Sequence, residues 1–358
     1  GGSPLLDMVQ TGTSITLEPV AATEVLEGSE SADSIDMSAT TQAYVIAAGG
    51  DDVISHIGSG DTGYGGEGAD TFELSAIDVR RIDGGAGIDS VALPDVSSAF
   101  DFRASAGWLG TTFDNIELLR MADTSDQTLH MDGADIGRIV DGDNELVGDA
   151  AALVVVGNIG DRVNLYGNFE AGEDRYAEID GTPILFSEVS EDNVSLYFDQ
   201  NTIVTVYETD EGTSIYGNAE GEVLTGSPFD ETLSGRQGDD DLDAGLGMDV
   251  QLGGDGNDLI KYDGLDSLID GGRGVDTAII TGNVDLSSVD NLENIEILDM
   301  SDNGTADTIE LNLSDVLDIV GDNSLSGYEV ESDNKVLVIK GDAEDEVLIG
   351  GLALDLIS

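Results

Sequence analysis

The sequence predicts an all-β fold in which short strands recur at a fixed interval. The segment GGDGNDLIK at 253–261 fits the nonapeptide template G-G-x-G-x-D-x-apolar-x at every fixed position. The aspartates Asp240, Asp249 and Asp258 stand nine residues apart, and an upstream run of aspartates keeps the same interval. A nonapeptide repeat of this kind is typical of parallel β-helical solenoids.

The charge of the chain limits its partners. Twelve basic residues face 75 acidic ones, which gives a net charge of −63. A compact fold with this charge repels itself unless cations neutralise part of the charge or salt screens it. Nucleic acid and anionic membranes are therefore excluded as favoured partners. Hydrophobic residues make up 40% of the chain, which is too many for an acidic disordered tail.

The absence of cysteine, together with the acidic composition, is compatible with an exported protein that is stabilised by metal instead of disulfides. There is no cysteine, which excludes disulfides and thiolate metal sites. No run approaches the roughly 20 apolar residues of a transmembrane helix, so direct membrane insertion is not expected. No N-terminal signal peptide is visible either.

Longer matches show that the chain holds two copies of one module. LEGSESADSI at 26–35 matches LTGSPFDETL at 224–233, and FDNIELLRM at 113–121 matches LENIEILDM at 292–300. The second copy stops before the equivalent of the first copy's hairpin tail, which predicts that it is truncated. The predicted organisation is a lead-in strand segment at 1–23, a first module with a solenoid cap and hairpin tail at 24–208, a linker at 209–221, and a second module at 222–358.

Each nonapeptide supplies a turn and a strand. The glycines allow backbone angles that other residues avoid, and the x-apolar-x end forms a strand whose apolar side chain points inward. At two equivalent places this inward residue is Gly63 or Gln251, so weak packing is expected there. The other predicted inward residues are Ile54, Phe72, Val91, Leu233, Leu242 and Ile260.

Each module is also expected to contain one short helix. SDVLDIV at 314–320 has a helical pattern with Ser314 as the expected N-cap, and DGADIGRIV at 132–140 is its counterpart.

The nonapeptides resemble the calcium-binding repeats of the RTX (repeats-in-toxin) family, also called hemolysin-type repeats. This resemblance implies a right-handed parallel β-roll in which two nonapeptides form one coil. It also implies that Ca²⁺ lies between stacked turns, which are 18 residues apart, and takes an aspartate from each. The segments after the repeats, with an N-I-E motif and a V-L-x-I helix, resemble those of large type I-secreted bacterial surface adhesins.

The resemblance implies two sets of metal-site residues. Asp258 would serve two ions, whereas Asp249 is expected to have a weaker site because residue 267 is Ser267. The acidic candidates are Asp52, Asp61, Asp70, Asp89, Glu231, Asp240, Asp249, Asp258 and Asp276. The glycine candidates are Gly50, Gly68, Gly87, Gly238, Gly247, Gly256 and Gly274.

Catalytic motifs do not appear. The two histidines, His56 and His130, occupy non-equivalent places in the duplication and are interpreted as structural. No H-E-x-x-H, G-x-S-x-G or P-loop motif occurs, so the chain is not expected to be an enzyme.

The expected function is that of a calcium-dependent structural module of a secreted RTX protein, a bacterial cell-surface adhesin that folds outside the cell. Its expected partners are calcium and cell-surface or self-association partners. One alternative is a subunit of a calcium-dependent extracellular lattice or filament. Another is the non-catalytic tail of a secreted enzyme.

Overall fold

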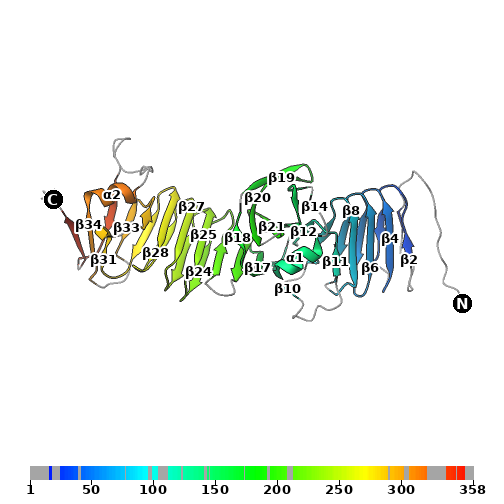
Figure 1. Ribbon diagram of the computed structural model, residues 1–358, viewed down its shortest axis with the longest axis horizontal. Coiled ribbons are helices and arrows are strands. Elements are labelled where there is room, and N and C mark those ends of the chain that lie inside the picture. Colours follow the sequence, from blue (N-terminus) through cyan, green and yellow to red (C-terminus); the bar gives the residue numbers. More distant parts are fainter. Residues whose placement is uncertain are drawn as a thin grey trace. The chain divides into compact units, whose positions relative to one another are not determined.

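Parallel strands form most of the chain in the computed structural model, which has 55% strand and 5% helix (Figure 1). The prediction of an all-β chain is confirmed at this level. The structure describes residues 16–17, 25–38, 42–76, 78–95, 99–103, 112–121, 124–140, 143–144, 146–172, 174–191, 194–207, 213–288, 291–301, 306–320, 336–343 and 345–350. The chain divides into two units, Gly1–Val206 and Tyr207–Ser358.

One long stack and two shorter stacks of parallel strands build the first unit, and antiparallel strands extend the long stack. One stack contains, in spatial order, β1 (Thr16–Leu17), β3 (Ser34–Asp36), β5 (Val53–Ile57), β7 (Thr71–Leu74), β9 (Ser90–Ala92), β12 (Leu118–Arg120), β16 (Ala152–Val156) and β21 (Val194–Asp199). The antiparallel strands that extend it are β20 (Thr182–Glu191), β18 (Glu170–Ala171) and β19 (Arg175–Ile179).

The opposite side of the first unit carries two shorter parallel stacks. The first is β2 (Val25–Glu27), β4 (Tyr44–Gly49), β6 (Thr62–Glu67), β8 (Arg81–Ala86) and β11 (Thr112–Asp114). The second is β10 (Ala99–Asp101), β13 (Thr128–Asp132), β17 (Arg162–Tyr166) and β22 (Ile203–Tyr207). A small antiparallel pair joins β14 (Asp143–Asn144) to β15 (Asp149–Ala150).

The second unit repeats this arrangement in three parallel stacks. The first stack is β23 (Thr213–Tyr216), β25 (Thr232–Gln237), β27 (Val250–Asp255), β29 (Leu268–Arg273) and β32 (Leu292–Glu293). The second stack is β24 (Val223–Ser227), β26 (Asp241–Gly245), β28 (Leu259–Tyr262), β30 (Thr277–Ile280), β33 (Ile297–Asp299) and β35 (Val338–Lys340). The third stack is β31 (Val284–Asp285), β34 (Thr308–Asn312) and β36 (Glu346–Gly350). A short 3-10 helix, η2, spans Leu286–Ser288. Strand β23 lies within the range predicted as a linker and pairs with β25.

The register of these strands places turns 18 residues apart on top of one another. Thr232 lies opposite Val250, which in turn lies opposite Leu268. In the other stack, Asp241 lies opposite Leu259. Each coil of the chain therefore contributes one strand to each stack, and equivalent turns follow one another along the same edge.

The predicted inward residues form the apolar interior of each unit. Apolar side chains at alternate positions of a strand face inward, because successive side chains point to opposite faces of the strand. This prediction is confirmed, since all six side chains are 0% exposed: Ile54, Phe72, Val91, Leu233, Leu242 and Ile260.

The two positions expected to pack weakly are filled. A Cβ at Gly63 would lie 3.0 Å from the ring of Phe72 and 3.3 Å from Cδ1 of Ile82, so these larger neighbours occupy its space. Gln251 is 1% exposed, and its Nε2 donates a 2.7 Å hydrogen bond to the carbonyl of Lys261. The expectation of weak packing is wrong, because neighbouring coils compensate for both side chains.

Each unit contains one short α-helix, α1 (Gly133–Ile139) and α2 (Leu313–Ile319). Asp132 caps α1 in a reciprocal capping box with Asp135. At α2 the residue before the helix is Asn312, whose Oδ1 accepts a 2.9 Å hydrogen bond from the amide of Ser314. The prediction of Ser314 as the N-cap is wrong, because the helix starts one residue earlier, where β34 ends. No helix among the described residues has the length and apolar character needed to cross a membrane.

The interior predicts a large difference between inward and outward substitutions. Ile260→Ala should lower the free energy of unfolding by about 2–5 kcal/mol, because it opens a cavity at a fully buried position. Val223→Ala is the control, since Val223 is 69% exposed and its loss should change stability by less than about 0.5 kcal/mol. Denaturant unfolding at a fixed calcium concentration compares the two variants. Equal losses would contradict this assignment of the core.

Candidate metal-binding turns

Aspartates at the starts of successive strands form a continuous ladder in each unit. In the first unit the amide of Asp52 donates to Oδ1 of Asp70 at 2.9 Å, and the amide of Asp70 donates to Oδ1 of Asp89 at 2.8 Å. In the second unit the amide of Asp240 donates to Oδ1 of Asp258 at 2.9 Å, and the amide of Asp258 donates to Oδ1 of Asp276 at 2.8 Å. The structure therefore brings together the predicted pairs of aspartates on both ladders.

The second carboxylate oxygen of each ladder aspartate is buried and has no hydrogen-bond partner. A buried polar atom without a partner costs free energy, and native proteins rarely leave one unsatisfied. Here the Oδ2 atom lacks a hydrogen-bond partner in one turn after another, and the aspartates that carry it are at most 2% exposed. The atoms are Oδ2 of Asp52, Asp70, Asp89, Asp240, Asp249, Asp258 and Asp276.

Glycines at the first template position leave an oxygen-lined space beside these atoms. A Cβ at Gly235 would lie 2.2 Å from Oδ2 of Asp240 and 2.6 Å from the carbonyl oxygen of Gly253. A Cβ at Gly253 would lie 2.3 Å from Oδ2 of Asp258 and 2.5 Å from the carbonyl oxygen of Gly271. Each such space is therefore bordered by a carboxylate oxygen of its own turn and a carbonyl oxygen of the next turn. These glycines were not among the predicted site residues.

The predicted glycines lie at the fourth template position and allow the turns to stack. A Cβ at Gly68 would lie 2.3 Å from the carbonyl oxygen of Gly50, and one at Gly256 would lie 1.8 Å from that of Gly238. A Cβ at Gly247 would lie 2.2 Å from the carbonyl oxygen of Phe229. The fourth-position glycines with positive φ are Gly50, Gly68, Gly87, Gly238, Gly256 and Gly274. Only glycine tolerates both this backbone angle and this close approach.

Asp61 has a different environment from the ladder aspartates. Its Oδ1 accepts a 2.8 Å hydrogen bond from the amide of Ala43, and its Oδ2 accepts a 2.9 Å hydrogen bond from Gly58 in its own turn. Both oxygens are engaged, and the neighbouring coil presents Ala43 where a ladder would present an acid. The structure does not bring Asp61 together with another predicted site carboxylate.

The equivalent edge of the second unit contains Glu231 and Asp249. The amide of Glu231 donates to Oδ1 of Asp249 at 2.7 Å, which brings the predicted pair together. Both carboxylate oxygens of Glu231 accept hydrogen bonds from Ser227, one from its amide and one from its hydroxyl. Glu231 is therefore already satisfied within its own turn, whereas Oδ2 of Asp249 has no hydrogen-bond partner.

Two further aspartates lie near Asp249 on the turn that contains Ser267. The pKa of Asp266 is raised to about 7, mainly by burial, and the negative charges of Asp263 and Asp249 contribute to this rise. The amide of Ser267 donates to the backbone carbonyl of Asp249 at 2.8 Å. Asp263 and Asp266 do not keep the nine-residue interval, so the periodicity could not identify them.

Burial also dominates the electrostatics of the ladders. It raises the pKa of Asp52, Asp240 and Asp276 to about 7 and that of Asp89 to about 8. In Asp89 and Asp276 the charge of the neighbouring ladder aspartate adds to this effect. Without a cation these carboxyl groups hold their protons to a higher pH than an ordinary aspartate does.

Backbone oxygens are essential to any cation site in these turns. Among the described residues, no three histidine, cysteine, aspartate or glutamate side chains gather in a group that could hold a metal ion. A bound cation would therefore take carbonyl oxygens in addition to one or two carboxylates. This donor set consists of oxygen only and suits a hard cation such as Ca²⁺.

The two histidines lie outside the ladders. His56 has a φ of 58° and its Nδ1 lies 2.9 Å from Oδ1 of the exposed Asp36. Nδ1 of His130 lies 3.1 Å from the hydroxyl of Tyr166, on the outward side of β13. Neither position combines a histidine with a nucleophile and a second base.

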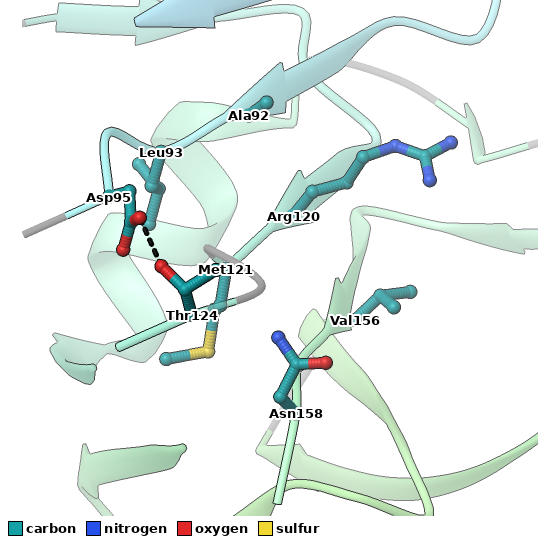
Figure 2. A pocket seen from close by; sticks show the side chains of 9 residues that line it. Ala92, Leu93, Asp95, Arg120, Met121, Thr124, Val156 and Asn158 are labelled. Atoms are coloured by element: carbon teal, nitrogen blue, oxygen red, sulfur yellow. Dashed lines mark hydrogen bonds between the residues drawn. The ribbon is translucent and has the colours of Figure 1, made fainter. Parts of the chain in front are cut away.

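One open cavity, with a volume of about 460 Å³, lies where β9, β12 and β16 end (Figure 2). Asp95 and Thr124 on its wall are joined by a hydrogen bond, and Arg120 extends away from them. The guanidinium of Arg120 pairs with Asp180 at 2.9 Å. The wall includes Asp95 as its one acid and contains no histidine or predicted metal-site residue.

No protein-family model matches the chain, and no curated protein matches it. The function of the turns is therefore argued from the chemistry of their own residues.

The space beside the first-position glycines predicts a strong effect of a single methyl group. Gly253→Ala should lower the thermal midpoint and weaken calcium binding, because the new Cβ would fill the space between Asp258 Oδ2 and the Gly271 carbonyl. Gly350→Ala is the control, since its Cβ would meet no atom closer than 3.9 Å. Thermal unfolding and calorimetric titration would test this prediction. Unchanged calcium binding by Gly253→Ala would contradict it.

The raised pKa values predict how stability depends on pH without calcium. The folded chain holds more protons than the unfolded chain between the ordinary aspartate pKa of 3.8 and the folded-state values of about 6 to 8. The contribution of the ladder aspartates to stability in EGTA should therefore be complete below about pH 4 and be lost as the pH rises towards about 8. Asp276→Asn should weaken the dependence of stability on pH more than Asp255→Asn does. The second variant is the control, because the side chain of Asp255 is 54% exposed. Thermal midpoints that rise with pH in EGTA would refute the assignment.

Proposed function

We propose that this chain is a calcium-dependent structural module of a secreted RTX protein, a bacterial cell-surface adhesin, and that it adopts a right-handed parallel β-roll with calcium between its turns. One observation carries the proposal. Both units repeat the same buried aspartate oxygen without a hydrogen-bond partner, next to a carbonyl oxygen from the following turn.

The chemistry of these turns suits calcium. Ca²⁺ takes about six to eight oxygen ligands at about 2.3–2.6 Å in flexible geometry. Asp52, Asp70 and Asp89 would hold ions in the first unit. Asp240, Asp258 and Asp276 would do so in the second. A bound ion supplies positive charge that links adjacent coils.

The charge of the chain supports a role outside the cell. A net charge of −63 opposes compaction when calcium is scarce, which keeps the chain extended and exportable. Extracellular calcium modules bind their ions at about 10⁻⁴–10⁻³ M, so folding would follow export. Several sites, each adding about 1.4 kcal/mol at ten times its dissociation constant, would offset a narrow core.

An adhesin role is supported by the way the units extend. Each coil adds one strand to each stack, at about 4.8 Å per coil, so modules of this kind can build a spacer from repeated sequence. The duplicated N-I-E segments, which resemble those of secreted surface adhesins, support the same interpretation.

Calcium removal tests the proposal. Addition of EGTA should abolish most of the far-ultraviolet strand signal and lower the thermal midpoint, and calcium should restore both. Sodium chloride at about 0.15 M, which screens charge without binding the turns, should restore much less. Magnesium should also restore less, because it demands a smaller and more rigid site. An unchanged strand signal and midpoint in EGTA would defeat the proposal.

A further inference from the structure

The tripeptide N-I-E occupies the same structural position in both units, where it lies next to the last nonapeptide turn in the stack of coils. It spans 115–117 in the first unit and 294–296 in the second. Its asparagines have φ of 54° and 51°, a conformation in which asparagine can replace glycine. The first strand after it, β12 or β33, continues the parallel stack that contains β9 or β30.

The asparagine continues the column of carbonyl oxygens. A Cβ at Gly84 would lie 2.1 Å from the carbonyl oxygen of Asn115, and one at Gly271 would lie 2.3 Å from that of Asn294. Within the ladder, a Cβ at Gly253 would lie 2.5 Å from the carbonyl oxygen of Gly271. The asparagine carbonyl thus takes the place that a glycine carbonyl has in the preceding turns.

The asparagine side chain holds this carbonyl in position. Nδ2 of Asn115 donates a 2.8 Å hydrogen bond to Oδ1 of Asp83, and Nδ2 of Asn294 donates a 2.7 Å hydrogen bond to Oδ1 of Asp270. Each acceptor immediately precedes the first glycine of the last turn. The turn and the tripeptide are therefore connected by side chain and by backbone.

The glutamate continues the column of carboxylates. Oε2 of Glu117 accepts a 2.8 Å hydrogen bond from the amide of Asp89, and Oε2 of Glu296 accepts one of 2.8 Å from Asp276. These are the bonds that one ladder aspartate makes with the next. Asp89 and Asp276 are 0% exposed, and their Oδ2 atoms have no hydrogen-bond partner.

The isoleucine connects this position to the helix. The amide of Ile116 donates to the carbonyl of Ile139, the last residue of α1, at 3.1 Å. The amide of Ile295 donates to the carbonyl of Ile319, the last residue of α2, at 2.9 Å. The tripeptide is therefore hydrogen-bonded on one side to the last aspartate turn of the ladder. On the other side it is hydrogen-bonded to the short helix of its unit, α1 or α2, which we call the cap helix.

We propose that the N-I-E tripeptide completes one further calcium site in each unit, outside the nonapeptide repeats. Its ligands include Asp89, Glu117 and the carbonyl of Asn115 in the first unit, and Asp276, Glu296 and the carbonyl of Asn294 in the second. Calcium at this site joins the ladder to the cap helix, so ion binding also orders α1 and α2. This inference depends on the proposed calcium-binding function.

The test compares two glutamates three residues apart. Glu296→Gln removes the charge but keeps an oxygen that can accept the Asp276 amide. Glu293→Gln is the control, because Glu293 is exposed. Calorimetric titration of the full chain should show one ion fewer for Glu296→Gln and the wild-type number for Glu293→Gln. Glu117→Gln combined with Glu296→Gln should lose two ions, and Glu296→Asp should retain more affinity than Glu296→Gln.

Hydrogen exchange provides a second measurement that does not depend on counting ions. In calcium, Glu296→Gln should increase exchange in 292–299 and 308–319 but leave 232–245 protected. If the wild-type chain binds no calcium, the proposed function itself fails. If the wild-type chain binds calcium and Glu296→Gln binds the same number with the same affinity and the same protection, the N-I-E site is refuted while the proposed function stands.

Discussion

Burial of carboxylates in stacked turns is the constraint on which the rest of this structure depends. Each ladder aspartate uses one oxygen to accept the amide of the preceding ladder acid, and this bond links adjacent coils. The other oxygen is left in a space lined by backbone carbonyls, where negative charge is costly unless a cation or a proton compensates it. The fold is therefore tied to the composition of the solution around it.

The same constraint explains why glycine is so frequent in the turns. First-position glycines leave space beside the carboxylate, and fourth-position glycines let one turn approach the next. A Cβ at Gly274 would lie 1.5 Å from the carbonyl oxygen of Gly256, so no larger residue fits without moving a whole coil. The apolar interior consists only of the inward side chains of these short strands, so each coil relies on its neighbours for stability.

The two units share one ladder edge and differ at the other. Asp61 is engaged by Ala43 and Gly58, whereas the equivalent Asp249 keeps an oxygen without a hydrogen-bond partner and lies near Asp263 and Asp266. Residues that align in the duplication therefore need not do the same chemistry. The shared N-I-E junction, in contrast, has the same bonds in both units.

The period of the fold can be predicted from the amino-acid sequence, because a nine-residue repeat of glycine, aspartate and apolar residue is a local pattern. It was enough to place Ile54, Phe72 and Ile260 inside and to align Asp240 with Asp258. The three-dimensional structure was needed to show which carboxylate oxygens lack a hydrogen-bond partner and that Glu117 and Glu296 extend the ladders. These features depend on which backbone atoms lie above and below a turn, and irregular spacings of 20 and 28 residues place the two glutamates there. A strictly periodic pattern carries no information about such contacts.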